Sequence, residues 1–306
     1  MKIKIWVSLL LVYILWGSTY LAIRFAVETI PPFLMAGTRF LAAGLILHVW
    51  RRLAGDPAPT RKEWLSAAII GLLLLLGGNG MLSWAEQNVP SGVAALLIGS
   101  VPLWMAAIEA VRPGGARPNW LGFLGLVVGF GGIALLVGPD LAGGSKADLH
   151  PLGLTVLLFA SLSWSLGSIY SRHAELPRSA LLSTSMEMLA GGAGLILLGS
   201  ATGEWRSLAV SQVALHSWLG LAYLVVFGSM VAYTAYTWLL RNAPLPLVST
   251  YAYVNPLIAI LLGSLLAGEL LTARILAAAF VIVGSVVVIN LSRRVKAPEP
   301  SAAPAD

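Results

Sequence analysis

The chain has 306 residues, of which 58% are hydrophobic and only 10% are charged, and it contains no cysteine. Such a composition lacks the polar surface of a water-soluble globule. The missing thiols exclude disulfides, cysteine-based zinc sites and iron–sulfur clusters. The net charge of +6 comes from basic residues between hydrophobic stretches, which argues against nucleic acid as a partner. We therefore expect membrane lipid around the chain, and neither a cofactor nor a metal.

Ten hydrophobic stretches follow one another, each close to the roughly 20 residues with which a helix crosses about 30 Å of hydrocarbon. Transmembrane β-strands would alternate apolar with polar residues, and the runs 69–76 and 280–289 do not. The prediction is an all-α integral membrane protein with ten transmembrane helices. In chain order the predicted spans are 5–25, 32–53, 64–84, 91–112, 119–139, 151–171, 178–201, 214–240, 245–267 and 272–292.

The first stretch follows a basic N-terminus, as in a signal peptide, but it has no cleavage-site pattern and is expected to be retained as a helix. The loops predict the topology, because lysine and arginine favour the cytoplasmic side. With the N-terminus in the cytoplasm, most of the 19 basic residues fall on that side. We therefore expect a multi-pass protein of the bacterial inner membrane with both termini cytoplasmic. The basic residues that fall elsewhere are Arg24, Arg39, Lys146, Arg206 and Arg274.

Similar residues recur at a fixed distance in the two halves of the chain. The offset is 148 residues (164 − 16) in the early spans and 154 (238 − 84) in the later ones. Since each half has five spans, the halves are predicted to be inverted repeats, a common construction of secondary transporters. The predicted parts are a repeat at 1–139, a linker at 140–150, a repeat at 151–292 and a disordered cytoplasmic tail at 293–306. The recurring pairs are Trp16 and Trp164, Arg24 and Arg172, Arg39 and Glu187, Gly44 and Gly192, Trp84 and Trp238, Asn88 and Asn242, Pro90 and Pro244, and Pro102 and Pro256.

Polar and aromatic side chains deep in the predicted spans are the candidate binding residues. Three deep tryptophans carry indole N–H groups that hydrocarbon cannot satisfy, so each faces a polar cavity or bonds a neighbouring helix. Polar side chains also recur at helical spacing, among them Ser100 with Trp104 and Tyr251 with Asn255. Such polar stripes must face one another or water, although hydroxyls also bond their own helix. The candidates are Trp16, Tyr20, Asn79, Trp104, Trp164, Tyr233 and Asn255.

Arg39 and Glu187 are the clearest ionisable residues deep in the spans, where a charge is costly. They occupy equivalent repeat positions, so they are predicted either to form a static ion pair or to act in transport. In the second case Arg39 would meet a substrate carboxylate, or Glu187 would carry a proton. The acidic residues at span edges, Glu86 among them, are expected to be solvated.

Two proline residues and a glycine pair bear on helix geometry. Pro102 and Pro256 interrupt equivalent helices and free backbone carbonyls, which either form plain kinks or bind a substrate. Gly125 and Gly129 form a GxxxG pattern that permits close helix packing, within the chain or in a homodimer.

The sequence resembles the EamA-type branch of the drug/metabolite transporter superfamily, and its YedA-type members in particular, over roughly residues 5–292. The resemblance implies a central cavity formed by helices one to four and six to nine, with the fifth and tenth helices peripheral. It also implies export of amino acids or related metabolites, and it places six of the candidates in the cavity: Trp16, Asn79, Trp104, Trp164, Tyr233 and Asn255. The motifs that carry it are Trp16-Gly17-Ser18-Thr19-Tyr20 with Arg24, Pro31-Pro32 followed by Thr38-Arg39-Phe40, and the stretch 84–97.

The leading hypothesis is therefore a secondary transporter that exports or exchanges a small neutral or zwitterionic metabolite by alternating access. A lipophilic-cation exporter is the main alternative, because aromatic rings with Glu187 suit a cation. A carrier of phosphate esters would need several deep cations, and only Arg39 is deep. A channel filter is not evident. A membrane-embedded enzyme is a distant alternative, since the sequence has no HExxH or GxSxG motif.

Overall fold

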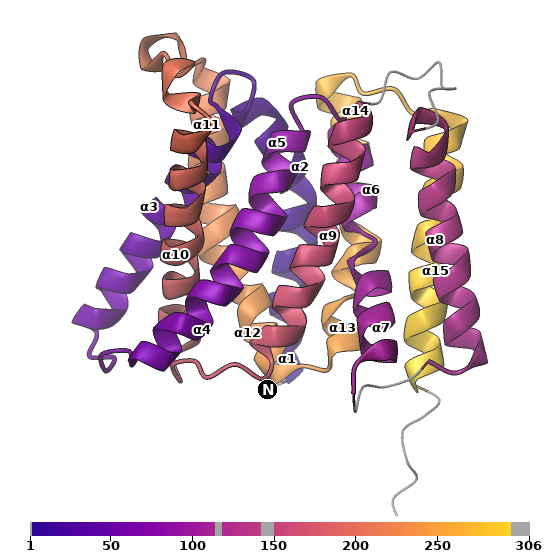
Figure 1. Ribbon diagram of the computed structural model, residues 1–306, viewed down its shortest axis with the longest axis horizontal. Coiled ribbons are helices and arrows are strands. Elements are labelled where there is room, and N and C mark those ends of the chain that lie inside the picture. Colours follow the sequence, from indigo (N-terminus) through magenta and orange to yellow (C-terminus); the bar gives the residue numbers. More distant parts are fainter. Residues whose placement is uncertain (1, 114–117, 142–149, 295–306) are drawn as a thin grey trace, which may run out of the picture.

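The computed structural model describes residues 2–113, 118–141 and 150–294, and all regular secondary structure in these ranges is helical. Most of the predicted linker (142–149) and of the predicted tail (295–306) lies outside the described residues. In Figure 1 the long helices stand side by side, and the N-terminus and the end of α15 lie at the same end of the bundle.

The helices follow the predicted order. Where one predicted span is divided, its parts are consecutive along the chain. The bounds are α1 (Lys2–Leu11), η1 (Val12–Trp16), α2 (Gly17–Ala26), α3 (Pro32–Leu53), α4 (Arg61–Gly71), η2 (Leu72–Gly80), α5 (Met81–Ala85), α6 (Ser91–Ile98), α7 (Val101–Val111), α8 (Trp120–Leu141), α9 (Pro151–Ser171), α10 (Ala180–Ala201), η3 (Glu204–Arg206), η4 (Val210–Gln212), α11 (Leu215–Tyr223), η5 (Leu224–Tyr233), α12 (Thr234–Asn242), α13 (Leu245–Val248), α14 (Tyr251–Ala267) and α15 (Ala273–Arg294).

Eight helical stretches in the described part of the chain are long and apolar enough to cross a membrane. They coincide with the first eight predicted spans, and shorter apolar helices at Val254–Ala267 and Ala273–Ile289 lie within the last two. Hydrocarbon offers no hydrogen-bond partner to a backbone, so a helix is the conformation that such stretches adopt. The chain thus has the apolar helices of a multi-pass membrane protein.

Helices α3 and α10 cross antiparallel in extensive contact. Glycines permit the approach: a Cβ atom on Gly37 would lie 2.8 Å from the side chain of Ile196, and one on Gly44 would lie 2.9 Å from Met188 Cβ. Helix α10 also crosses α4, where a Cβ on Gly191 would lie 2.6 Å from the carbonyl oxygen of Gly71. Such contacts are typical of membrane helices, whose association depends on van der Waals packing.

Helices α8 and α15 pack against each other at one edge of the molecule (Figure 1). The glycines of the GxxxG pattern face α15, with Gly125 against Ile289 and Gly129 against Ser285. This glycine face is therefore covered within the chain and is not open to a second copy.

Two spans are interrupted near their middle or their start. Gly99 and Ser100 separate α6 from α7, with Pro102 in the first turn of α7, and α13 is separated from α14, which contains Pro256. A Cβ atom on Gly99 would lie 3.0 Å from Pro256 Cγ, so the break between α6 and α7 packs against α14. The sequence predicted an interruption at Pro256, but α14 continues through this residue.

Three other spans contain widened, π-helical turns at η1, η2 and η5. Such turns are rare and occur frequently at functional sites, because they displace side chains from the regular helical positions. Trp16, Asn79 and Ser229 lie in these three segments.

Candidate functional site

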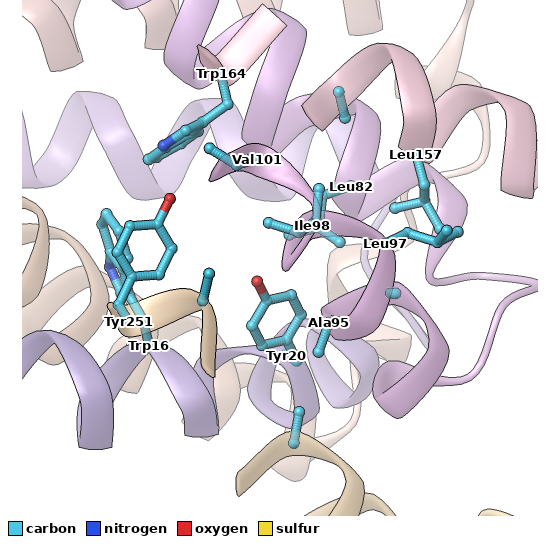
Figure 2. Close-up of a cluster of buried hydrophobic side chains, with 14 of the residues drawn as sticks. Trp16, Tyr20, Leu82, Ala95, Leu97, Ile98, Val101, Leu157, Trp164 and Tyr251 are labelled. Carbon is cyan, nitrogen blue, oxygen red and sulfur yellow. The ribbon is translucent and has the colours of Figure 1, made fainter. Parts of the chain in front are cut away.

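A cavity lies among η1, α2, α3, η2, α5, α6, α9 and α14, with about 430 Å³ of space free of protein atoms. Five of the predicted binding residues line it, together with residues that were not proposed as binding residues. In Figure 2, Trp16, Tyr251 and Trp164 stand along one side, and Tyr20, Leu82 and Ile98 lie across from them. The lining residues are Trp16, Thr19, Tyr20, Arg39, Gly78, Asn79, Leu82, Ile98, Trp164 and Tyr251.

One wall of the cavity is aromatic. The Trp16 and Trp164 rings meet edge to face with centroids 5.4 Å apart, and the Tyr251 ring lies 5.6 Å from Trp16 in the same geometry. The indole N–H groups bond within the protein: Trp16 Nε1 donates to the Gly228 carbonyl at 3.2 Å, and Trp164 Nε1 donates to the Tyr236 hydroxyl at 3.0 Å. These bonds fix both indoles, so the wall presents ring faces and edges to a ligand.

Arg39 supplies a buried positive charge to the cavity, since its side chain is only 2% exposed. Its Nε donates to Ser229 Oγ at 2.7 Å, and its guanidinium carbon lies 4.7 Å from the centre of the Phe40 ring. Nη1 is buried and has no hydrogen-bond partner within the described chain. A guanidinium presents a planar fork of donors that matches a carboxylate. A free nitrogen of that fork is therefore available to an anionic group.

The absence of a side chain at Gly228 makes room for this guanidinium. A Cβ atom there would lie 2.8 Å from Arg39 Nη2, and the Gly228 carbonyl also accepts the Trp16 indole N–H. Adjacent residues of η5 therefore hold both groups, because Gly228 accepts from Trp16 and Ser229 accepts from Arg39.

Glu187 lies outside the cavity, in a hydrogen-bond network of its own. Its carboxylate accepts from Tyr233 at 2.8 Å and from Ser183 Oγ at 3.1 Å. Arg241 Nη2 in turn donates to Ser183 Oγ at 2.6 Å. The predicted candidates Glu187 and Tyr233 are therefore partners of each other and do not line the cavity.

The predicted ion pair between Arg39 and Glu187 is wrong. The register of the α3–α10 crossing explains why: His48 Nδ1 lies 3.1 Å from Ser185 Oγ. The two helices run antiparallel, so Glu187, two residues after Ser185, lies beside the position on α3 that is two residues before His48. That position is about seven residues from Arg39, or roughly 10 Å along the helix. Two residues at equivalent positions of the two repeats come into contact only if both lie near the point where their helices cross.

Two further candidates are also placed away from the cavity. Trp104 packs on Phe130 with ring centroids 5.0 Å apart, and its buried Nε1 has no partner within the described chain. Asn255, 2% exposed, lies beside the carbonyls of Tyr251 and Tyr13, to which its amide nitrogen can donate at 3.3 and 3.1 Å. Asn255 therefore joins α14 to η1.

Sequence reasoning missed several residues at the cavity. Thr19 belongs to the motif at residues 16–20 and Tyr251 to a polar stripe, so the sequence offered a reason to propose both. Leu82 and Ile98 are apolar, and nothing in the sequence distinguishes them from core residues. Tyr236, which accepts from Trp164 and bonds Ser168 at 2.7 Å, was also missed.

The sequence profile of the EamA-like transporter family matches the chain twice, over residues 3–138 and 151–291. The chain belongs to the EamA-like transporter family. Among its relatives is an uncharacterized inner membrane transporter, YedA of Escherichia coli K12, 40% identical over 97% of this chain and 94% of the relative. An uncharacterized transporter of Synechocystis, sll0355, is 27% identical over 96% of this chain and 92% of its own length.

A solved crystal structure has the same fold, with a TM-score of 0.66 at 20% identity, over 95% of this chain and 98% of its own. Family membership identifies the protein as a multi-pass membrane transporter. The cavity lies between the two segments that match the family, because Trp16, Tyr20, Arg39 and Asn79 belong to the first and Trp164 to the second. A binding site between two such halves is the usual arrangement in secondary transporters.

Proposed function

We propose that this transporter exports or exchanges a small zwitterionic metabolite, an amino acid or a related compound, across the inner membrane by alternating access. The observation that carries the proposal is the pairing, in one cavity, of an aromatic wall with the buried guanidinium of Arg39. The carboxylate of the substrate binds Arg39, and its apolar part packs on Trp16 and Trp164. The substrate ammonium group lies over an aromatic ring face or bonds Asn79.

The charge of the cavity favours such a substrate. A single buried cation suits one carboxylate, whereas a phosphate ester carries more charge than one guanidinium balances. A lipophilic cation remains an alternative because aromatic walls bind cations, but Arg39 opposes it and Glu187 lies in a separate network.

We propose further that the chain crosses the membrane ten times as two inverted five-helix repeats, with both termini in the cytoplasm. The double match to one family profile supports the repeat. The position of the N-terminus and of the end of α15 at one end of the bundle supports an even number of crossings (Figure 1). Rocking of the two halves about the cavity would expose it to each side in turn.

The proposal predicts saturable flux of labelled amino acids in liposomes that contain the purified protein. Replacement of Trp164 by phenylalanine removes the anchoring N–H and part of the wall, so flux at low substrate is expected to fall about tenfold, equivalent to about 1.4 kcal/mol. Trp120→Phe is the matched control, because Trp120 is 75% exposed on α8 and should leave flux unchanged. Flux of lipophilic cations alone would favour the alternative, and the absence of any flux from folded protein would contradict transport of these compounds.

A further inference from the structure

Glu86 occupies an unusual position for a carboxylate. It directly follows α5, at the end of the Arg61–Ala85 span, where the sequence predicted a solvated side chain. That prediction is wrong, because Glu86 is 0% exposed. Both of its carboxylate oxygens are buried without a hydrogen-bond partner in the described chain. A buried carboxylate of this kind is strongly disfavoured in its charged form.

Glu86 lies between the cavity and a hollow at the end of the bundle where α2 ends and α6 begins. Leu82, one helical turn earlier, lines the cavity, and Asn88, two residues later, lines the hollow. Arg24 also lines the hollow, and its Nη1 donates to the Glu86 carbonyl at 2.5 Å. Along the chain, Glu86 therefore lies between a residue that lines the cavity and a residue that lines the hollow.

Charged and titratable groups face Glu86 from three neighbouring elements. Tyr20 and Arg24 come from α2, Arg39 from α3, and Glu269 from the loop between α14 and α15. Burial, followed by the nearby Glu269 carboxylate, raises the pKa of Glu86 well above its usual value, and the two arginines oppose this rise. Arg39 is thus within electrostatic reach of Glu86 and also faces the cavity.

The carboxylate of Glu269, by contrast, has hydrogen-bond donors from the backbone. Its two carboxylate oxygens accept from the backbone N–H groups of Ser91 and Gly92 at 2.7 and 3.0 Å, at the start of α6. Of the two neighbouring carboxyl groups, Glu86 is the one whose oxygens are buried without a hydrogen-bond partner in the described chain.

We infer that Glu86 is a proton-binding site of this transporter, and that its proton is linked to occupation of Arg39 by a substrate carboxylate. The inference rests on the proposed function. A carboxylate at Arg39 neutralises the positive charge that favours ionised Glu86, so the O–H bond of Glu86 becomes more stable. When the substrate leaves and water enters from the hollow, that bond breaks and the proton passes to water. Because linkage is reciprocal, lower pH strengthens substrate binding.

The proton site can be tested without any substrate, by infrared difference spectroscopy of the purified protein between pH 6 and pH 9, roughly the range above the usual carboxyl pKa. Because Glu187 is a second buried carboxyl group, all variants are compared in a Glu187→Gln background, in which protein that retains Glu86 should lose a protonated-carboxyl band as the pH rises. Glu86→Gln should lack this band, and the control Glu109→Gln, whose carboxylate pairs with Arg112 at 3.2 Å, should keep it. The Gln variant should fold, because the oxygens of Glu86 make no hydrogen bond that would be lost. A band that persists in Glu86→Gln would overturn the assignment.

The linkage is tested with L-phenylalanine and L-leucine as probes, in weakly buffered solution with a pH-sensitive dye. Wild type should take up protons on binding, with affinity rising by up to about tenfold per pH unit of acidification. Glu86→Gln should bind without proton uptake, and Glu86→Asp should restore it. Binding to wild type without proton uptake would overturn the linkage. If neither amino acid binds, the proposed function fails while the infrared test still decides whether Glu86 holds a proton.

Discussion

Replacement of Arg39 by methionine should abolish the preference of the transporter for substrates that carry a carboxylate. Hydrogen bonds to charged groups contribute about 1.5–3 kcal/mol each, so loss of one or two lowers the affinity for an amino acid by about ten- to a hundredfold or more. The amide of the same amino acid lacks the negative charge and should bind wild type and Arg39→Met about equally. Competition against a labelled amino acid in purified protein measures both affinities.

The control for this experiment is Arg52→Met, which removes a positive charge from the exposed end of α3. It should leave both affinities unchanged. Arg39→Met is expected to fold, because it replaces a buried charge by an apolar side chain of similar length. Equal loss of the amino acid and of its amide would show that Arg39 shapes the cavity without binding the carboxylate.

Replacement of Gly71 by alanine should destabilise the protein strongly. A Cβ atom there would overlap the Glu187 carbonyl oxygen and lie 3.0 Å from the Gly191 nitrogen, and both of these are backbone atoms. Backbone atoms cannot rotate out of the way, so α4 and α10 must separate, at a cost of about 1–3 kcal/mol or more. The melting temperature in detergent should fall by several degrees, and Gly191→Ala should show a comparable loss.

Gly131→Ala is the matched control for this prediction. Gly131 lies in α8 with no neighbouring atom within 4 Å of an added Cβ. Alanine is favoured over glycine inside a helix by about 0.5–1 kcal/mol, so this variant should melt at the same or a higher temperature. Equal melting temperatures for Gly71→Ala and Gly131→Ala would contradict the close crossing of α4 and α10.

Much of the helical architecture could be predicted because hydrocarbon imposes it. Long apolar stretches have to form helices in a membrane, and the first eight predicted spans coincide with helices of sufficient length. The pairing of Trp16 with Trp164 in one wall was also within reach, since both lie deep in their spans. These inferences depend on local composition, which the sequence displays directly.

The predictions that failed concern residues whose environment depends on contacts between distant segments. Trp104 was placed in a polar stripe with Ser100, but the break between α6 and α7 falls at Ser100, so regular spacing does not continue across it. Glu86 was expected to be solvated, and it is buried by neighbours that the sequence does not reveal. The π-helical turn at η2, which positions Asn79, has no recognisable signal in a run of leucines and glycines.

The central claim is that the cavity holds the substrate and opens to each side of the membrane in turn. Because the chain has no cysteine, a single introduced cysteine is the only thiol in the protein. Leu82→Cys places this thiol in the cavity, and Ala54→Cys and Ser207→Cys place it on exposed positions in two separate loops as controls for accessibility. All three are labelled in liposomes with a membrane-impermeant thiol reagent, added to one side or the other.

The account predicts that the Leu82→Cys thiol reacts from both sides, and that saturating amino acid slows its labelling. The amino acid should not change the labelling rate of either loop thiol. A Leu82→Cys thiol that reacts from one side only, at a rate that is independent of the amino acid, would contradict the account.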